Sequence, residues 1–325
     1  MSKTVLLIGC GELGSRHLQA AVSLSEISEI YIVEPNSSSI ERGKTRINEV
    51  SDLNPKIKFK WFNNLEDAPV NGDLCIVATQ AGGRAALIKQ ASELGYQNFF
   101  IEKIVTQSVS DYQSLLDLAA QKGLKVWVNC KTRAYGVHKY IKSCLDPNAP
   151  IVFTDMGGNH GLANNGVHSV DLFVFYDGSE NLISSGSRID QVLHKTKRGL
   201  LDLSGTFNGH TEKGSDFMVS FAGSHNSPDH ISIVSSKCRF IVDHFQKFAW
   251  ESHADKNWKW QNIPIDDNWS VSFMSKAFIQ DILNNNTCEL PTLLDCYPAH
   301  KFILSELQPH FNMLTGEQND YCPVT

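Results

Sequence analysis

The sequence lacks three features that define common classes of protein. No apolar run reaches the roughly 18 residues that a membrane-spanning helix needs. The N-terminus passes from a short polar start into a strand-like segment, without the apolar stretch and cleavage site of a signal peptide. The formal charge of −6 comes from interspersed charges, and no basic stripe is present for nucleic acid. We therefore expect neither a membrane nor a nucleic acid as partner.

Paired cysteines are also missing. The eight cysteines are scattered singly and none forms a CxxC pair, whereas a zinc knuckle or a disulfide framework would need such spacing. The pattern predicts no bound metal, and unpaired thiols in a reducing cytoplasm. With 42% hydrophobic and 20% charged residues among 325, the composition is that of a globular protein of about two domains.

The first part of the chain alternates strand and helix patterns. Continuous apolar runs such as TVLLIGC and DLCIVATQ are typical of strands covered on both faces, and the stretches between them have helical spacing. Strands that alternate with helices of about ten to fifteen residues indicate βαβ units. We expect an α/β fold whose residues 1–147 form a Rossmann domain with a doubly wound parallel sheet.

The pattern changes near Pro147. A helix is predicted over 161–176, then alternating segments such as DFMVSFAG and CRFIVDHF, then two helical patterns at the end. Strict alternation is typical of antiparallel strands with one exposed face. We expect residues 148–325 to form a second α/β domain, built on an open, mostly antiparallel sheet.

Three glycines follow the first strand. Gly9, Gly11 and Gly14 form G-x-G-x-x-G at the opening of the first helix, with Glu12 and Leu13 between the last two. Such a loop turns tightly, lets the backbone approach a pyrophosphate and offers it the free N–H groups of a helix N-terminus. The pattern predicts a dinucleotide cofactor.

Glu34 ends the second strand, at the place where an acidic residue is expected in this fold. Its carboxylate can bind the ribose hydroxyls of NAD and would repel the 2′-phosphate of NADP. Arg42 lies just beyond and would weaken that preference. The sequence favours NAD, with NADP possible.

Ligands of such sheets bind beyond the carboxyl ends of the strands. Ala78 and Thr79 leave the fourth strand and could lie against the nicotinamide ribose. Glu102 and Lys103 leave the fifth, either at this crevice or as a solvated strand end. Arg133 follows the sixth, available to an anionic substrate or as a plain surface charge.

The stretch GLANNGVHSVD carries unusual polarity just before an apolar run. If it is helical, Asn164, His168 and Asp171 lie at i, i+4 and i+7 and share one face. His168 would then be either a hydrogen-bonded structural histidine or a member of a site.

In their order along the chain, these motifs resemble the Gfo/Idh/MocA family, whose members include glucose–fructose oxidoreductase and inositol dehydrogenase. The resemblance rests on G-x-G-x-x-G, the A-T loop, the E-K step, the arginine after strand six and G-G-x₅-N-x-G-x-H-x₂-D. It spans nearly the whole chain and implies a homodimer or homotetramer. The terminal DYCPVT also resembles the ends of members that work in bacterial surface-sugar pathways.

The resemblance also implies residue roles. Lys103 matches the lysine of the family's Glu-Lys-Pro motif, and His168 and Asp171 match the histidine and final aspartate of its D-x-G-x-H-x-x-D helix. The chain departs from the family pattern at three positions, where a proline, a histidine and the first aspartate of that helix are replaced by Ile104, Arg84 and Asn164.

These roles predict an NAD(P)-dependent dehydrogenase or reductase acting on a secondary alcohol or ketone of a sugar, cyclitol or nucleotide sugar. His168 would be the general base, because imidazole titrates near neutral pH. Lys103 would stabilise the developing alkoxide and Asn164 would orient the substrate. Two alternatives remain open: a reductase of a C=N or C=C bond, as in a biliverdin reductase, and a cofactor-binding sensor with reduced catalysis.

Overall fold

The structure, a computed structural model, describes residues 2–196 and 199–324, and its packing divides the chain into two compact units. Unit 1 comprises the chain up to Thr106, Ser110–Asn129 and Asn268–Leu294, and unit 2 comprises the remainder. This division differs from the single boundary expected after residue 147. Residues 130–147 pack with unit 2, and helix α7 (Val271–Asn285) packs with unit 1 because it lies against α1 (Gly14–Ala21).

Unit 1 contains the predicted parallel sheet, with its strands in the order β3-β2-β1-β4-β5-β6. All pairings in it are parallel, and β4 is buried along its whole length, as its continuous apolar run predicts. The strands are β1 (Lys3–Ile8), β2 (Ile27–Val33), β3 (Lys58–Phe62), β4 (Leu74–Val77), β5 (Asn98–Ile101) and β6 (Lys125–Val128).

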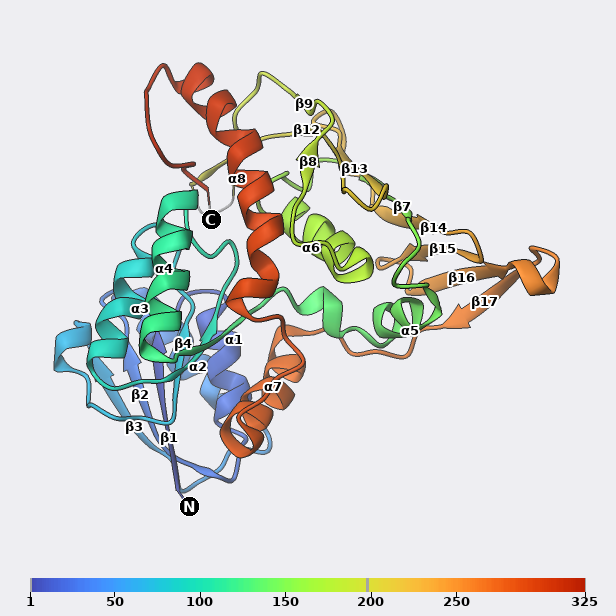
Figure 1. Cartoon of the computed structure of the whole chain (residues 1–325). Coiled ribbons are helices and arrows are strands. Elements are labelled where there is room, and N and C mark those ends of the chain that lie inside the picture. Colours follow the sequence, from blue (N-terminus) through green and yellow to red (C-terminus); the bar gives the residue numbers. More distant parts are fainter. Residues whose placement is uncertain (1, 197–198, 325) are drawn as a thin grey trace. The chain divides into compact units, whose positions relative to one another are not determined.

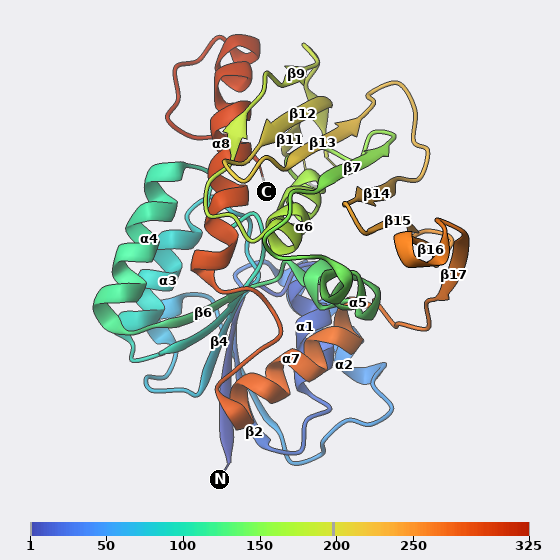
Figure 2. The same cartoon turned by 45° about the vertical axis from the view of Figure 1, so that its right-hand side comes forward.

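Helices cover both faces of this sheet. Helices α1, α2 (Ser37–Asn48) and α7 lie on one face, and α3 (Arg84–Glu93) and α4 (Val109–Lys122) lie on the other (Figures 1 and 2). Helix α2 begins where Asn36 Oδ1 accepts the backbone N–H groups of Ser38 and Ser39. The predicted Rossmann architecture is confirmed.

Unit 2 is built on a mixed sheet in the order β17-β16-β15-β14-β7-β13-β12-β8, with β9 also paired to β12. The β7–β13 pairing is parallel and the others are antiparallel, which confirms the predicted, mostly antiparallel sheet. Its strands are β7 (Val152–Gly157), β8 (Ile183–Ser184), β9 (Arg188–Ile189), β12 (Gly205–His210), β13 (Asp216–Phe221), β14 (His230–Val234), β15 (Cys238–Asp243), β16 (Phe248–His253) and β17 (Trp260–Pro264).

One face of this sheet forms the core of unit 2. Helices α6 (Gly166–Asp177) and α8 (Leu293–Thr315) pack on it, and the Phe217 ring lies 4.7 Å from that of Phe173 and 5.1 Å from that of Phe302. Alternate residues of β12, β13 and β15 are buried and their neighbours partly exposed, so the opposite face is open. The shorter elements are α5 (Gly136–Cys144), the antiparallel pair of β10 (His194–Lys195) and β11 (Leu201–Asp202), and 3₁₀ turns at Leu65–Asp67, Lys131–Ala134 and Ala254–Lys256.

Across residues 2–196 and 199–324, no helix has both the length and the apolar character needed to cross a membrane.

Candidate functional site

The predicted cofactor residues of unit 1 gather at the carboxyl ends of four adjacent strands, β2, β1, β4 and β5. The loops after β1 and β4 lie close together. A Cβ added to Gly9 would be only 3.0 Å from Thr79 Cγ2 and 3.1 Å from the carbonyl carbon of Ala78. The backbone N–H of Glu102 donates to Val77 O at 3.0 Å, which brings the end of β5 beside the same loop.

Each glycine of the first loop meets a different constraint. Gly9 has a φ of +87°, a left-handed conformation that favours glycine. A Cβ on Gly14 would lie 1.9 Å from Gly9 O, so α1 approaches β1 too closely for any side chain. A Cβ on Gly11 would meet nothing within 4 Å. A tight turn, close helix packing and an open approach to the backbone are what a pyrophosphate-binding loop requires, and the loop therefore fits a dinucleotide.

Glu34 is held in place by backbone donors. Its Oε2 accepts the N–H of Cys10 at 2.7 Å and its Oε1 accepts the N–H of Asn36 at 3.0 Å. Each carboxylate oxygen has a second lone pair with which it can accept a hydroxyl of a ligand. The carboxylate is thus fixed beside the glycine loop, where it fits the ribose of NAD.

Glu12, inside the glycine loop, is neutralised by two arginines of α2. Arg46 bonds its carboxylate through Nη2, and its Nη1 donates at 2.5 Å to Glu12 O and at 2.5 Å to Ser15 Oγ. Arg42 Nε lies 3.5 Å from Glu12 Oε2. The hydrogen bond from Arg46 lowers the pKa of Glu12. Sequence reasoning missed Arg46, which holds the glycine loop in place from α2, more than 30 residues further along the chain.

Glu102 lies in the interior rather than at the crevice expected for it. Only 3% of it is exposed, and its Oε1 pairs with His17 Nε2 at 2.9 Å and accepts from Asn129 Nδ2 at 2.7 Å. Burial alone would raise its pKa, but the hydrogen bond and charge of His17, with Asn129 and Lys103, lower it to about 2. Any contribution of Glu102 to cofactor binding would therefore come from its backbone.

Lys103 follows this anchored residue and is half-buried. The peptide bond between Lys103 and Ile104 is cis. The anchoring of Glu102 on one side and the burial of Ile104 (1% exposed) on the other fix the backbone that carries the lysine.

In unit 2, the helix that carries His168 begins later than predicted. Helix α6 starts at Gly166, so Asn164 precedes it and does not share a helical face with His168. The cause is Asp202, whose carboxylate accepts the N–H groups of Ala163 at 2.9 Å and Asn164 at 3.0 Å and holds this segment as a turn. Asn164 and His168 are both half-buried.

Asp171, one turn after His168, is fully engaged with Arg133. Arg133 Nε donates to Oδ2 at 2.6 Å and Nη2 donates to Oδ1 at 2.7 Å, and Nη2 also donates to Asp295 O at 3.1 Å. Burial would lower the pKa of Arg133, but the Asp171 carboxylate raises it. The pair joins α6 to the segment after β6 and uses two nitrogens of the arginine that was predicted to bind substrate.

Cys130, Asp171 and Cys296 form a buried cluster whose donor atoms lie within 4.8 Å of one another. Such a set has the chemistry of a soft metal site. However, both oxygens of the carboxylate already bind Arg133, whose positive charge opposes a second cation at the same place.

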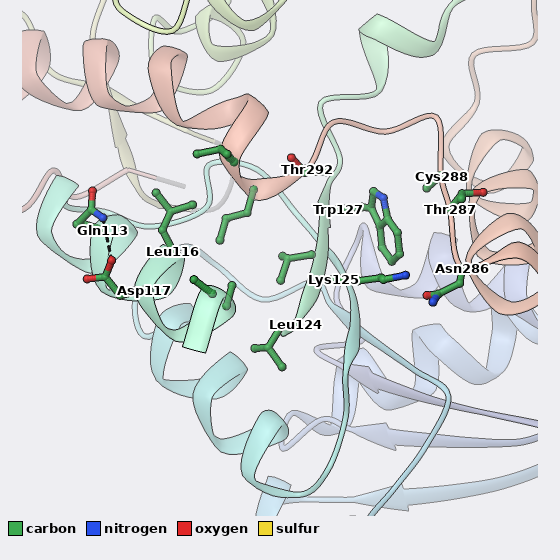
Figure 3. A pocket seen from close by; sticks show the side chains of 15 residues that line it. Gln113, Leu116, Asp117, Leu124, Lys125, Trp127, Asn286, Thr287, Cys288 and Thr292 are labelled. Carbon is green, nitrogen blue, oxygen red and sulfur yellow. Dashed lines mark hydrogen bonds between the residues drawn. The ribbon is translucent and has the colours of Figure 1, made fainter. Parts of the chain in front are cut away.

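A cavity of about 780 Å³ lies elsewhere in unit 1 (Figure 3). It is lined by α4, by β6 with the residue before it, by the segment between α7 and α8 and by the first two residues of α8, and most of the lining is apolar. Gln113 Nε2 donates to Asp117 Oδ1 at 3.0 Å on its α4 side. The lining includes none of the predicted site residues.

A doubly wound parallel sheet, a glycine loop that fits a diphosphate and a fixed acid at the end of β2 define a Rossmann domain that binds a dinucleotide. Residues 3–130 match the GFO_IDH_MocA family, described as an oxidoreductase family with an NAD-binding Rossmann fold. The N-terminal part of the chain thus matches the NAD-binding Rossmann domain of the Gfo/Idh/MocA oxidoreductases, which confirms the predicted resemblance, enzyme class and cofactor. A comparison with curated protein sequences finds no match.

Solved structures with the same fold cover nearly the whole chain. UDP-N-acetylglucosamine 3-dehydrogenase GnnA from Acidithiobacillus ferrooxidans is 13% identical, with a TM-score of 0.72 over 94% of this chain and 96% of that one. An oxidoreductase from Agrobacterium radiobacter in complex with NAD+, L-tartaric acid and magnesium is 14% identical, with a TM-score of 0.71 over 93% and 94%. The 3-ketoreductase KijD10 from Actinomadura kijaniata, in complex with NADP, is 17% identical, with a TM-score of 0.68 over 93% and 96%. At these identities the likeness shows the fold alone.

Proposed function

We propose that the protein transfers a hydride between a nicotinamide cofactor and a secondary alcohol or ketone of a sugar, cyclitol or nucleotide sugar. The observation that carries the proposal is the set of groups at one edge of the parallel sheet. The glycine loop, Glu34 and Lys103 follow β1, β2 and β5, which belong to a run of four neighbouring strands in the order β2-β1-β4-β5. Lys103 thus follows a strand at the same edge of the sheet as the loops that fit a dinucleotide. Neighbours of the same fold are a nucleotide-sugar 3-dehydrogenase and a 3-ketoreductase, which supports a sugar as substrate.

A nicotinamide held at this edge would supply the hydride chemistry, and the residues of the chain would supply proton transfer and charge stabilisation. His168 accepts the hydroxyl proton in oxidation and returns it in reduction. Lys103 stabilises negative charge on the reacting oxygen. Asn164 orients the substrate by hydrogen bonding, because an amide both donates and accepts but cannot carry a proton. Arg133 remains a candidate contact for an anionic group of the substrate.

The cofactor is proposed to be NAD, with NADP as the weaker ligand. Support comes from the fixed carboxylate of Glu34, which would repel a 2′-phosphate. Arg42 and Arg46 are engaged with Glu12. A 2′-phosphate would therefore have to compete for them.

A homodimer or homotetramer is proposed from the open face of the unit 2 sheet. Val152 pairs with Val234 and Ile241 pairs with Trp250 across neighbouring strands of this face. Val152, Val234 and Trp250 are 48%, 44% and 41% exposed. A second copy would bury these side chains, and light scattering of wild type and Trp250→Glu tests this. The reducing, cytoplasmic setting is part of the same proposal, which is supported by eight cysteines that all lie within the described residues and form no disulfide.

The test of function begins with a panel of free sugars and nucleotide sugars, UDP-N-acetylglucosamine included, in thermal-shift assays with NAD+ or NADH. A ligand at a hundred times its dissociation constant adds about 2.7 kcal/mol of stability. Panel members that stabilise the protein are then assayed for NADH formation or consumption. Ligand binding without any turnover would favour the cofactor-binding sensor over the enzyme.

His168→Ala decides the mechanism. We expect turnover to fall by about 10²–10⁴ while NAD+ affinity and melting temperature stay near wild type. A structural His168 would instead lower the melting temperature and leave the folded fraction fully active. Full specific activity in the variant rules out His168 as the proton acceptor.

A further inference from the structure

Arg84, the first residue of α3, is buried beneath the two loops that meet at the cofactor edge of unit 1. It is 1% exposed. Its Nη1 donates to Glu102 O at 2.6 Å, to Val105 O at 3.3 Å and to Ile104 O, and its Nη2 donates to Thr79 O. One guanidinium therefore binds carbonyls on both sides of Lys103 and, at the same time, the loop after β4.

The chemistry of arginine suits this task. The guanidinium is planar and permanently charged, and it presents its donors in a rigid fork. Hydrogen bonds from an ionised donor are about twice as strong as neutral ones. A lysine at this position has a single point of charge on a flexible stem and would not hold the same carbonyls in a fixed arrangement. The contacts of Arg84 thus restrain the backbone on both sides of Lys103 and that of the loop after β4.

The restraint complements the side-chain network on the same segment. His17 and Asn129 hold the carboxylate of Glu102, whereas Arg84 holds the carbonyls before and after Lys103. Because Arg84 also binds Thr79 O, a movement of the Lys103 segment away from the Ala78–Thr79 loop would break these bonds.

We propose that Arg84 is a positioning residue that fixes Lys103 with respect to the Ala78–Thr79 loop, and so fixes the lysine charge relative to the reacting oxygen. The inference rests on the proposed function, in which Lys103 stabilises that oxygen. Misplacement of a catalytic group by about 1 Å costs about 10²-fold in rate. We expect Arg84→Lys to lower kcat by about that factor, with a smaller change in NAD+ affinity.

The first measurement needs no substrate. Hydrogen–deuterium exchange of Arg84→Lys and Arg84→Met should be roughly tenfold faster than wild type in residues 102–106, with β1 and β2 unchanged. Arg46→Met is the matched control, because Arg46 is also a buried arginine of unit 1 bound to a carbonyl, that of Glu12. This variant should instead speed hydrogen–deuterium exchange in residues 9–16. Unchanged exchange in 102–106 for a folded Arg84→Lys protein would overturn the inference.

The second measurement is a double-mutant cycle in kcat, using the panel sugar that gives turnover. If Arg84 acts through Lys103, Arg84→Lys adds little to the loss already caused by Lys103→Met. A merely structural role gives losses that multiply, because a reduced folded fraction acts on any variant alike, and multiplied losses would overturn the inference. If Lys103→Met keeps the wild-type kcat, the proposed function of Lys103 fails, whereas the exchange result still reports whether Arg84 restrains the segment.

Discussion

Arg133 and Asp171 form a buried, two-pronged ion pair in unit 2, with N···O distances of 2.6 and 2.7 Å. The exposed fractions of the two side chains are 10% and 1%. Their pairing gives Asp171 a structural task, since it ties the helix that carries His168 to the segment that follows β6. It also means that a substrate anion would share Arg133 with an existing partner.

Breaking this pair should destabilise unit 2. Removing one partner of a buried ion pair costs about 3–5 kcal/mol, because the other charge stays buried without compensation. We expect Arg133→Met and Asp171→Leu each to lose stability in urea denaturation, and the double variant to recover much of it. Arg188→Met, at an 80% exposed arginine, is the control and should change little. If Arg133→Met keeps its stability but loses affinity for a panel sugar, substrate binding is the main task of Arg133.

Substitutions of Gly11 and Gly14 should have different effects, the first on cofactor binding and the second on stability. Gly11→Val places a side chain in open space, so the protein should fold normally yet lose NAD+ binding, as measured by calorimetric titration. Gly14→Ala puts a methyl group 1.9 Å from Gly9 O and should lower the melting temperature before any ligand is added. Unchanged NAD+ affinity in a folded Gly11→Val protein would exclude the loop as the pyrophosphate site.

The carboxylate of Glu34 should set the cofactor preference. Glu34→Ser removes the negative charge, and we expect the ratio of NADP to NAD affinity to rise. Glu34→Gln is the matched control. Its amide oxygen can still accept the backbone N–H of Cys10, but the negative charge is gone. If wild type already binds NADP more tightly than NAD+ in direct titrations, the role given to Glu34 is contradicted.

Asp155 should make stability depend on pH. Burial, together with the charge of Asp229, raises its pKa to about 8 despite the hydrogen bond from Ser169. The folded state therefore binds a proton that the unfolded state has released above its own pKa, near 4. Stability from this group should fall as pH rises from about 4 to 8, by up to about 1.4 kcal/mol per pH unit.

Asp155→Asn isolates this effect. An asparagine stays neutral, so the variant should be more stable than wild type at pH 8 and should show a flatter dependence of unfolding free energy on pH. Asp320→Asn, at an exposed aspartate, is the control. A wild-type pH dependence that persists in Asp155→Asn would show that another group titrates.

The parallel sheet could be predicted because its evidence is local. Buried parallel strands read as continuous apolar runs, and the glycine loop and Glu34 stand at fixed places after the first two strands. Strand β7 was missed, although it lies inside the second sheet. Its VFTDMG carries polar residues, and its parallel partner β13 lies about 60 residues further along the chain. Pairing at such a distance leaves no local pattern.

The residues that hold the site residues in place by hydrogen bonds could not be predicted either, because they are distant from them in the sequence. His17 lies 85 residues from Glu102, Arg46 lies 34 from Glu12, and Arg84 lies 20 from Ile104. The start of α6 is likewise set by Asp202, 38 residues after Asn164. Residue type and spacing indicated which side chains could do chemistry, but the hydrogen bonds that hold them depend on the completed fold.

The placement of α7 in unit 1 has a consequence for synthesis on the ribosome. His17 on α1 finds its partner Ser275 on α7, and the ring of Phe278 packs against Phe100 at 6.3 Å. A nascent chain that ends near residue 150 has made every strand of the parallel sheet but leaves this side of α1 uncovered. The core of unit 1 therefore cannot close until α7, which ends at Asn285 of the 325 residues, has been made. A fragment of residues 1–147 would expose apolar surface and be prone to aggregate.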